Sequence, residues 1–488
     1  MKSSLLLSLT LAFLLLGAGC QPEKPEDETA GPLTPVLRSD EYTPIPAGFD
    51  YPLPQEQILG WVNAYDLDSI RNHAWNLWAG VNQLTASGEK VWETWHPIYQ
   101  VMPPSPEPDT NGLPNLDPNN KTIPQYETKH PCKPGYGRFL NVPLILTANI
   151  FYNDKLINWI REKGLHRDAV LDSMLKAGMK EVPHAPHGAM IIKHVYWPVS
   201  KYKEEFSVLP MWDGPAGKDS NAYNGFETWD RAVALTMYKD VPDTVSGEYL
   251  WHVANREDFN YRYEKMSTVH MDRFYTFPLN QANLALLSES DKCIISNCFN
   301  QAFNRDMEEG DALVSLGMHI LSKEIPDWAM QTAWWHDKPD APYNQKYSAN
   351  KPTNLPPGPW QNYVMSTAYF MSIPNAPGGE PHIAFSPYIE CVIPEANRIN
   401  SNCQNCHIRA AHPTAGKPFY IAHITGQEYE APNIHGAFYD CGREGFISTD
   451  DPIFKGLIRT DFNWSIPDRS VEAKQADSIR DFVSALPR

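Results

Sequence analysis

The apolar positions of the chain recur with a helical period in two early segments. In residues 57–81 they return at spacings of three and four, and Asp66 or Asp68 is placed to cap the second half of that stretch. Residues 155–179 repeat the pattern, with Gly164 as a breaking position near the middle. The folded part of the chain is therefore predicted to begin with helices.

Beyond Pro186 the pattern changes to short runs rich in β-branched and aromatic residues, which predict strands. These runs occupy residues 189–200, 206–214, 231–239 and 312–323. Helices followed by several strands, without a regular alternation of the two, favour an α+β fold over a doubly wound sheet. Near the end, residues 476–486 again carry apolar positions three and four apart and predict an amphipathic helix.

Proline and glycine punctuate the chain and suggest where its parts divide. Two Pro/Gly-rich loops, at residues 351–360 and 373–382, bracket a candidate boundary. The predicted divisions are a signal peptide at 1–19, a Pro-rich tether at 20–54, an α+β domain of unknown role at 55–360, and a mainly helical, loop-rich C-terminal region at 361–488.

Composition narrows the class of function. The 488 residues are 42% hydrophobic, which is enough for a sizeable core. The net charge of -17 repels phosphate backbones, so nucleic-acid binding is excluded as a first hypothesis.

The N-terminus has the pattern of an export signal. Lys2 precedes an apolar run over residues 5–16, which is too short for a membrane span, and small residues then lead to Cys20. This ending resembles a bacterial lipobox, in which Cys20 becomes the lipidated first residue; Gly17 departs from the preferred aliphatic residue, so plain cleavage stays an alternative. Gln21, in place of Asp, favours the outer over the inner membrane by resemblance to Gram-negative lipoprotein sorting.

The motif that carries chemistry is Cys403-Gln404-Asn405-Cys406-His407. Two thiols at this spacing can each bond one vinyl group of a single porphyrin, and the adjacent imidazole is delivered to the iron. With eight Cys and sixteen His in the chain, a chance occurrence is rare. Covalent attachment of this kind also needs an exported chain, which the N-terminus predicts independently. We therefore expect one covalent haem c, held by Cys403 and Cys406 with His407 as proximal iron ligand.

Three other interpretations of the motif stay open: a thioredoxin-like redox pair, half of a zinc site, or a local disulfide. A redox pair would need a strand before the helix, whereas this motif follows an Asn-Ser-Asn run. A zinc site would need a second pair of ligands nearby, and only His412 and the solitary Cys441 are available.

The sequence does not assign the sixth iron ligand, because no Met follows Met371 and a downstream Met is the usual ligand in small c-type cytochromes. Three histidines lie downstream of the motif: His412, His423 and His435. His435 and His423 are the preferred candidates because they lie 28 and 16 residues beyond His407, whereas His412 is expected to share the helix of His407 and face away. An upstream Met365 or Met371, His319 in the larger domain, and an open site remain alternatives.

The other cysteines are expected to form disulfides in an oxidising compartment. Cys293 and Cys298 are close enough in sequence for a small loop, and Cys391 could pair with Cys441, which leaves Cys132 over.

Two further clusters, His184 with His187 and Trp334–His336, invite a metal or substrate role. No carboxylate or third ligand stands at a useful spacing in the sequence, so loop turns and packed aromatic residues are the simpler interpretation.

Several segments together resemble a family of long exported c-type cytochromes that carry one haem near the C-terminus. The resemblance is carried by 73–82, 195–214, 317–337, 385–390, 400–410 and 459–468. It implies a cytochrome c-like haem region at 361–488 and a role only for Cys403, Cys406 and His407.

The leading functional hypothesis is a lipid-anchored, periplasm-facing monohaem cytochrome that transfers single electrons to an unidentified redox partner. A haem enzyme acting on peroxide or a small organic molecule is the alternative, since the chain lacks a downstream Met and carries much more protein than a carrier needs. A binding module served by a haem region is a third hypothesis.

Overall fold

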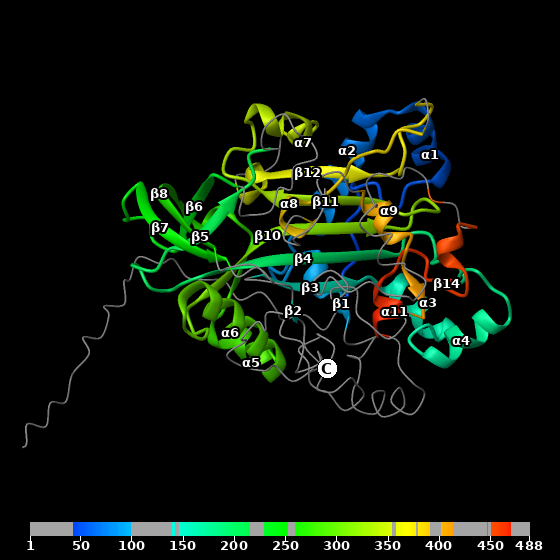
Figure 1. Ribbon diagram of the computed structural model, residues 1–488, viewed down its shortest axis with the longest axis horizontal. Helices are drawn as coiled ribbons and strands as arrows, with labels where there is room; N and C mark the ends of the chain where they lie inside the picture. The colour runs from blue at the N-terminus through cyan, green and yellow to red at the C-terminus, as the bar shows by residue number, and fades with distance from the viewer. Residues whose placement is uncertain are drawn as a thin grey trace, which may run out of the picture.

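The structure is a computed structural model that describes residues 42–98, 139–141, 146–214, 229–251, 259–353, 358–376, 379–390, 402–413, 447 and 450–469. These residues form the predicted α+β fold, in which helices cover both faces of one large sheet (Figure 1).

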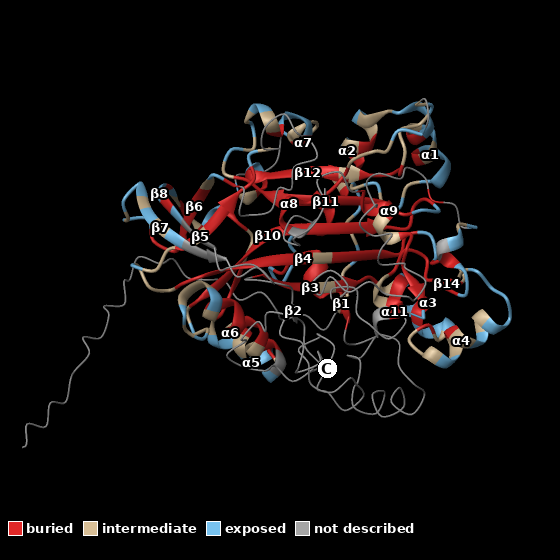
Figure 2. Cartoon of the chain, viewed as in Figure 1, coloured by how far each residue is buried: buried red, intermediate tan, exposed pale blue. Residues whose placement is uncertain are grey.

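Within the described residues, the large sheet has eight strands in the order β1-β3-β4-β10-β11-β12, with β2 beside β3 and β9 beside β10. Its strands are β1 (His96–Pro97), β2 (Phe139–Asn141), β3 (Thr147–Tyr152), β4 (Met190–Val199), β9 (Thr276–Pro278), β10 (Ala312–Ser322), β11 (Ala329–Trp335) and β12 (Tyr363–Ala368). All of these pairings are antiparallel. Figure 2 shows the central strands as a buried layer.

The two faces of the sheet belong to different apolar clusters, because successive side chains of a strand point to opposite sides. On β10, Met318 and Ile320 lie in the cluster that includes α1 (Gln55–Ala64) and α2 (Leu67–Val81). Leu321 lies in the other cluster, with α3 (Asp154–Lys163), α4 (Asp168–Lys176) and α9 (Cys403–His407). The face with Leu321, called the α9 face below, carries the Cys-x-x-Cys-His motif.

Aromatic side chains pack on the face of the large sheet opposite the α9 face. Trp78 of α2 meets Trp360 edge to face, with 4.1 Å between ring centroids, and also contacts Tyr363 of β12. Asp66 caps α2 by accepting a hydrogen bond from the Ser69 amide at 3.1 Å.

A second sheet and two helices flank the large sheet. The second sheet has the order β5-β6-β8-β7, with β6 and β8 parallel. Its strands are β5 (Ser207–Met211), β6 (Arg231–Thr236), β7 (Thr244–Trp251) and β8 (Phe259–His270); the helices are α5 (Gln281–Leu286) and α6 (Glu289–Phe303). The short helices are α7 (Gln345–Ser348), α8 (Pro387–Glu390), α11 (Ser465–Arg469), η1 (Val91–Thr94), η4 (Met271–Arg273), η5 (Pro342–Asn344), η6 (Pro359–Asn362) and η9 (Pro452–Phe454).

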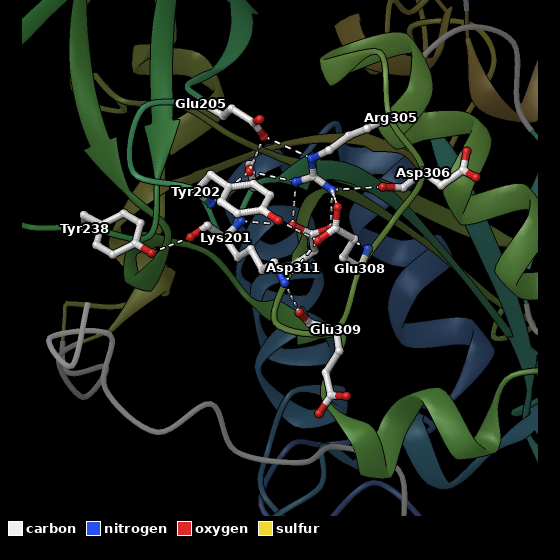
Figure 3. A network of polar contacts seen from close by, with 10 residues as sticks. Lys201, Tyr202, Glu205, Tyr238, Arg305, Asp306, Glu308, Glu309 and Asp311 are labelled. Atoms are coloured by element: carbon white, nitrogen blue, oxygen red, sulfur yellow. Dashed lines mark hydrogen bonds and ion pairs between the residues drawn. The ribbon is translucent and has the colours of Figure 1, made fainter. Parts of the chain in front are cut away.

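An ionic joint holds the end of β4 to the turn before β10 (Figure 3). The Arg305 guanidinium pairs with the fully buried Asp311 at 2.8 Å and with Glu205 at 3.1 Å. The Lys201 amide also donates to Asp311 at 2.9 Å. Because the buried carboxylate has partners on two segments, this cluster is a structural joint rather than a candidate site.

The helices and strands predicted from the pattern are confirmed. The 57–81 pattern is α1 and α2, the 155–179 pattern is α3 and α4 separated at Gly164, and the four predicted runs contain β4, β5, β6 and β10. The boundary expected between 360 and 361 falls between β11 and β12, which pair in the same sheet. The helix predicted at 476–486 lies outside the described residues. No helix in the described part of the chain is long and apolar enough to cross a membrane.

Candidate functional site

The Cys-x-x-Cys-His motif lies on one short helix, α9, which is capped by Asn402. The Asn402 side-chain oxygen accepts a hydrogen bond from the Asn405 amide at 3.1 Å. Its amide group donates to the carbonyl oxygens of Phe370 (3.1 Å) and His382 (2.8 Å). One side chain therefore starts the helix and fixes it to the segment that follows β12.

Gln404 fixes α9 to the sheet itself. Its amide donates to the carbonyl oxygens of Asp327 (3.2 Å) and Trp328 (2.7 Å), which directly precede β11. The helix packs against β11, and Figure 1 shows it in front of the sheet. The motif is thus held rigidly on the α9 face.

The two cysteines of α9 lie on one side of the helix. Three residues correspond to about 60° around a helix, so the side chains at positions 403 and 406 project in similar directions. Cys403 is buried and its thiol contacts the Ala384 carbonyl oxygen at 3.4 Å, while Cys406 is partly exposed. Both sulfurs are thiols and are not joined in a disulfide. This is the arrangement that two thioether bonds to one porphyrin need.

His407 ends the helix with a fixed ring orientation. Its Nδ1 lies 2.8 Å from the Phe462 carbonyl oxygen. A carbonyl can only accept, so Nδ1 carries the proton and Nε2 keeps a lone pair for a metal. Burial lowers the pKa of His407 to about 4, although the hydrogen bond to Phe462 acts in the opposite direction. The imidazole is therefore neutral near pH 7 and could serve as a metal ligand through Nε2.

The Phe462 carbonyl is presented by a strained turn. Asp461 and Phe462 both have left-handed backbones, with φ of 49° and 63°. Such a conformation is rare for a bulky aromatic residue and costs on the order of 1–3 kcal/mol. The Thr460 amide donates to the Ala410 carbonyl at 2.8 Å, just beyond α9, which holds the turn against the helix. The strain is stored at the point that orients His407.

Segments distant in sequence support this turn from both sides. The strand β14 (Ile458–Arg459) pairs with β13 (Ala411–His412). On its other side the Arg459 amide donates to the Lys180 carbonyl and the Val182 amide to the Arg459 carbonyl, each at 2.9 Å.

A charged cluster adjoins the turn through Asp461. The fully buried Asp461 carboxylate accepts from Lys323 at 2.6 Å, from the Ala185 amide at 2.8 Å, and lies 3.1 Å from His184 Nδ1. This hydrogen bond raises the pKa of His184. Burial lowers the pKa of Lys323, opposed by its pairing with Asp461.

Three metal-ligand types meet in this cluster: Glu181, His184 and Asp461 have ligand atoms within 4.8 Å of one another. However, Lys323 already neutralises Asp461, and Arg459 pairs with Glu181 at 2.6 Å. A divalent cation would have to displace two bound cationic side chains. The cluster is therefore an ion-pair support for the turn. The sequence-based argument that His184 has no carboxylate near it is wrong, because Glu181 and Asp461 both approach its ring.

The structure places the candidate distal ligands differently. His423 and His435 lie outside the described residues. The sequence predicted that His412 shares the helix of His407, and this is wrong. The helix α9 ends at His407, and His412 lies in β13. Its Nε2 is 3.0 Å from Asp172 of α4. His412 is therefore engaged by a carboxylate.

The upstream candidates are all buried on the large sheet or just beyond it. Met365 belongs to the cluster of the face opposite α9. Met371 belongs to the same cluster as Cys403. His319 lies on β10 with its Nε2 buried and without a hydrogen-bond partner.

The predicted disulfide between Cys293 and Cys298 is wrong. Both residues lie on α6, where five positions correspond to about 140° around the helix, so the side chains diverge. Cys298 is a buried thiol, and Cys293 is disulfide-bonded, but not to Cys298. Cys132, Cys391 and Cys441 lie outside the described residues.

The donor set fits a c-type haem: two thiols one helical turn apart, a neutral imidazole with Nε2 as the available nitrogen, and a second buried imidazole with an unpartnered nitrogen. Comparison of the chain with family models, with curated proteins and with solved structures found no match. Any functional assignment therefore depends on the residues of this chain.

Sequence reasoning missed Asp461 and Phe462 as site residues. The segment 459–468 contributes to the sequence analysis only through a resemblance, and no sequence signal predicts a Phe with a left-handed backbone.

Proposed function

We propose that the chain is an electron-transfer protein with one covalent c-type haem on Cys403 and Cys406 and with His407 as an iron ligand. The observation that carries the proposal is the hydrogen bond from His407 Nδ1 to the Phe462 carbonyl at 2.8 Å, directly after the two-thiol motif. A backbone acceptor on the far nitrogen of a histidine is the usual way to fix its tautomer and direct Nε2 to a metal.

The residues divide the work of attachment and orientation. Cys403 and Cys406 would hold the haem, each thiol by addition across one vinyl C=C bond, with its hydrogen passing to the other vinyl carbon and no oxidant required. Asn402 and Gln404 hold α9 in place for this step. The strained turn at Asp461 and Phe462 keeps the His407 ring from rotating.

Haem bound here would supply a single ferric/ferrous couple. The surrounding groups favour such a role over acid–base chemistry, since Cys403 lies in an apolar cluster with Ile408, Met330 and Phe462. In this proposal 361–488 is the cytochrome c-like, haem-carrying part of the chain, and an unidentified periplasmic protein is its redox partner.

A haem enzyme with an open distal position is the second candidate. Its support is the absence of any Met after Met371, since a downstream thioether commonly closes the site in small electron carriers. A high-spin ferric spectrum that shifts with cyanide or peroxide would favour the enzyme, and an inert low-spin spectrum favours the carrier.

The proposed location is the periplasmic side of a membrane, more specifically the outer membrane, through lipid on Cys20. Replacement Cys20→Ser is expected to release the protein from the membrane pellet after a carbonate wash, with its haem spectrum unchanged. Retention of the variant in the pellet contradicts the lipid anchor and leaves the haem proposal intact.

The proposal is tested on protein produced in a host that attaches c-type haem. A dithionite-reduced sample is expected to show c-type absorption bands, and acid acetone is expected to leave the haem on the polypeptide. Haem that is extracted by acid acetone, or a sample without these bands, contradicts the proposal.

A further inference from the structure

His319 is a buried histidine whose Nε2 atom has no hydrogen-bond partner among the described residues. It lies on the central strand β10, between Lys193 of β4 and Thr332 of β11 in register. The side chain is 8% exposed and its Nε2 has no hydrogen-bond partner. A buried polar atom left in this state costs about 1–3 kcal/mol, and a ligand on Nε2 would remove that cost.

The neighbourhood of His319 contains a second buried polar group without a partner. Thr332 Oγ1, its register neighbour, is also buried without a partner. Gly317 lies two positions before His319, and a Cβ there would meet only the Ala333 carbonyl oxygen, at 3.4 Å, among the described residues. Two buried polar atoms without partners therefore belong to register neighbours on β10 and β11.

His319 and the haem-type motif lie close together. The helix α9 packs against β11, the strand next to β10. His319 lies two positions before Leu321 on β10, so its side chain points to the α9 face, the face that carries Cys403. Lys193 of β4 is the register partner of His319.

We infer that His319 supplies the second axial ligand to the iron of the haem held by Cys403, Cys406 and His407. This inference rests on the proposed haem function. It makes the large sheet part of the redox site, because one ligand comes from α9 and the other from the centre of β10. It also explains why the chain needs no thioether after the motif.

Two competing histidines in the described part of the chain have other contacts, whereas Met371 competes directly with His319. His412 is engaged by Asp172. His194 stacks on Trp92, with 4.0 Å between ring centroids, and its Nδ1 lies 3.1 Å from Ser315 Oγ. Met371 shares an apolar cluster with Cys403 and is the one strong rival.

The test begins with the wild-type holoprotein. Magnetic circular dichroism in the near infrared is expected to show low-spin ferric haem with two nitrogen ligands. A band typical of Met ligation, lost in Met371→Ala, would overturn the inference, and so would a high-spin spectrum.

The ligand variants then identify the residue. His319→Ala is expected to keep covalent haem on a denaturing gel but to become high-spin, and added imidazole is expected to restore the low-spin spectrum. The matched control is His194→Ala, another buried histidine with an unpartnered Nε2, which should stay low-spin. A low-spin His319→Ala spectrum without imidazole overturns the inference.

The exchange of His319 for another possible iron ligand controls for misfolding of the His319→Ala variant. His319→Met is expected to remain low-spin, to gain the Met charge-transfer band and to have a higher reduction potential than wild type, since Met ligation raises it. If the exchange yields the wild-type spectrum, the inference is wrong. These outcomes are distinct from failure of the proposed function, in which wild-type protein carries no covalent haem.

Discussion

Two helices of this protein carry a pair of cysteines, and the spacing within each pair gives them different chemistry. On α6, Cys293 and Cys298 are five residues apart and about 140° apart around the axis. On α9, Cys403 and Cys406 are three residues apart and about 60° apart. A pair on one side of a helix can hold one rigid group, whereas a pair on opposite sides serves two separate purposes.

The two pairs also differ in the burial and the bonding of their cysteines. Cys298 is buried and donates to the Ile294 carbonyl at 3.4 Å within its own helix, and Cys293 is tied up in a disulfide. Cys406 is partly exposed beside His407, whose ring is held by a strained turn. The α6 pair thus consists of a disulfide-bonded cysteine and a buried thiol, whereas the α9 pair is the proposed site of haem attachment.

The sharpest test of this comparison removes the α9 thiols. The double replacement Cys403→Ser with Cys406→Ser is expected to abolish covalent haem, because no vinyl group can then be bonded. Haem staining of a denaturing gel measures the loss. The matched control is Cys298→Ala on α6, which should stain like wild type; equal staining of the double variant and wild type would contradict attachment at α9.

The next largest effect concerns the histidine that follows the α9 pair. His407→Ala is expected to retain covalent haem but to lose the low-spin bands, since the proximal imidazole is gone. Absorption spectra of the ferric and ferrous protein check this. His412→Ala is the control, because His412 is held by Asp172 and should leave the spectrum unchanged. A low-spin spectrum in His407→Ala that matches wild type would remove the role of His407.

Much of the fold was predictable from the sequence where side-chain pattern and local chemistry agree. Residues 67–81 combine helical periodicity with the Asp66 cap, and β10 is an apolar run of strand composition; both appear as predicted. The helix α6 was missed although Ser288 and Asp291 form a capping box, because Cys, Asn and Ser interrupt its apolar face. The strands β7 and β8 were missed because polar residues alternate through them.

The candidate site was predictable only as far as it is local. The motif at 403–407 needs five consecutive residues and is visible in the sequence. The Phe462 carbonyl is a backbone acceptor 55 residues beyond His407, and any residue type could supply it. The Cys293–Cys298 disulfide failed for a related reason, since nearness in sequence says nothing about direction until the helix is known.

The reactivity of Cys298 sharpens the contrast between the pairs. Burial raises the pKa of its thiol to about 12 from an ordinary 9.0. At pH 8 the reactive thiolate is therefore about a thousandfold scarcer than in the unfolded chain, and alkylation slows accordingly. The rate of alkylation of Cys298 in the native protein should rise about tenfold per pH unit through pH 10, because its pKa of about 12 lies above that range.

Iodoacetamide labelling with mass spectrometry measures this. In protein made without haem attachment, Cys406 is expected to react readily, because it is partly exposed, while Cys298 reacts only after unfolding in urea. Labelling of Cys298 in the native protein as fast as Cys406 would show that its burial does not suppress the thiolate.

The smallest expected effect compares the two cysteines of α6 by stability. Cys293→Ser removes a disulfide and is expected to lower the free energy of unfolding by about 2–4 kcal/mol, because the unfolded chain loses a constraint. Cys298→Ala removes only a buried sulfur and is expected to cost about 1 kcal/mol. Urea unfolding with and without reductant separates them: reductant should destabilise Cys298→Ala as it does wild type, and should affect Cys293→Ser less. If the two variants lose equal stability and respond equally to reductant, the disulfide at Cys293 does not constrain the unfolded chain, and the difference in role within α6 disappears.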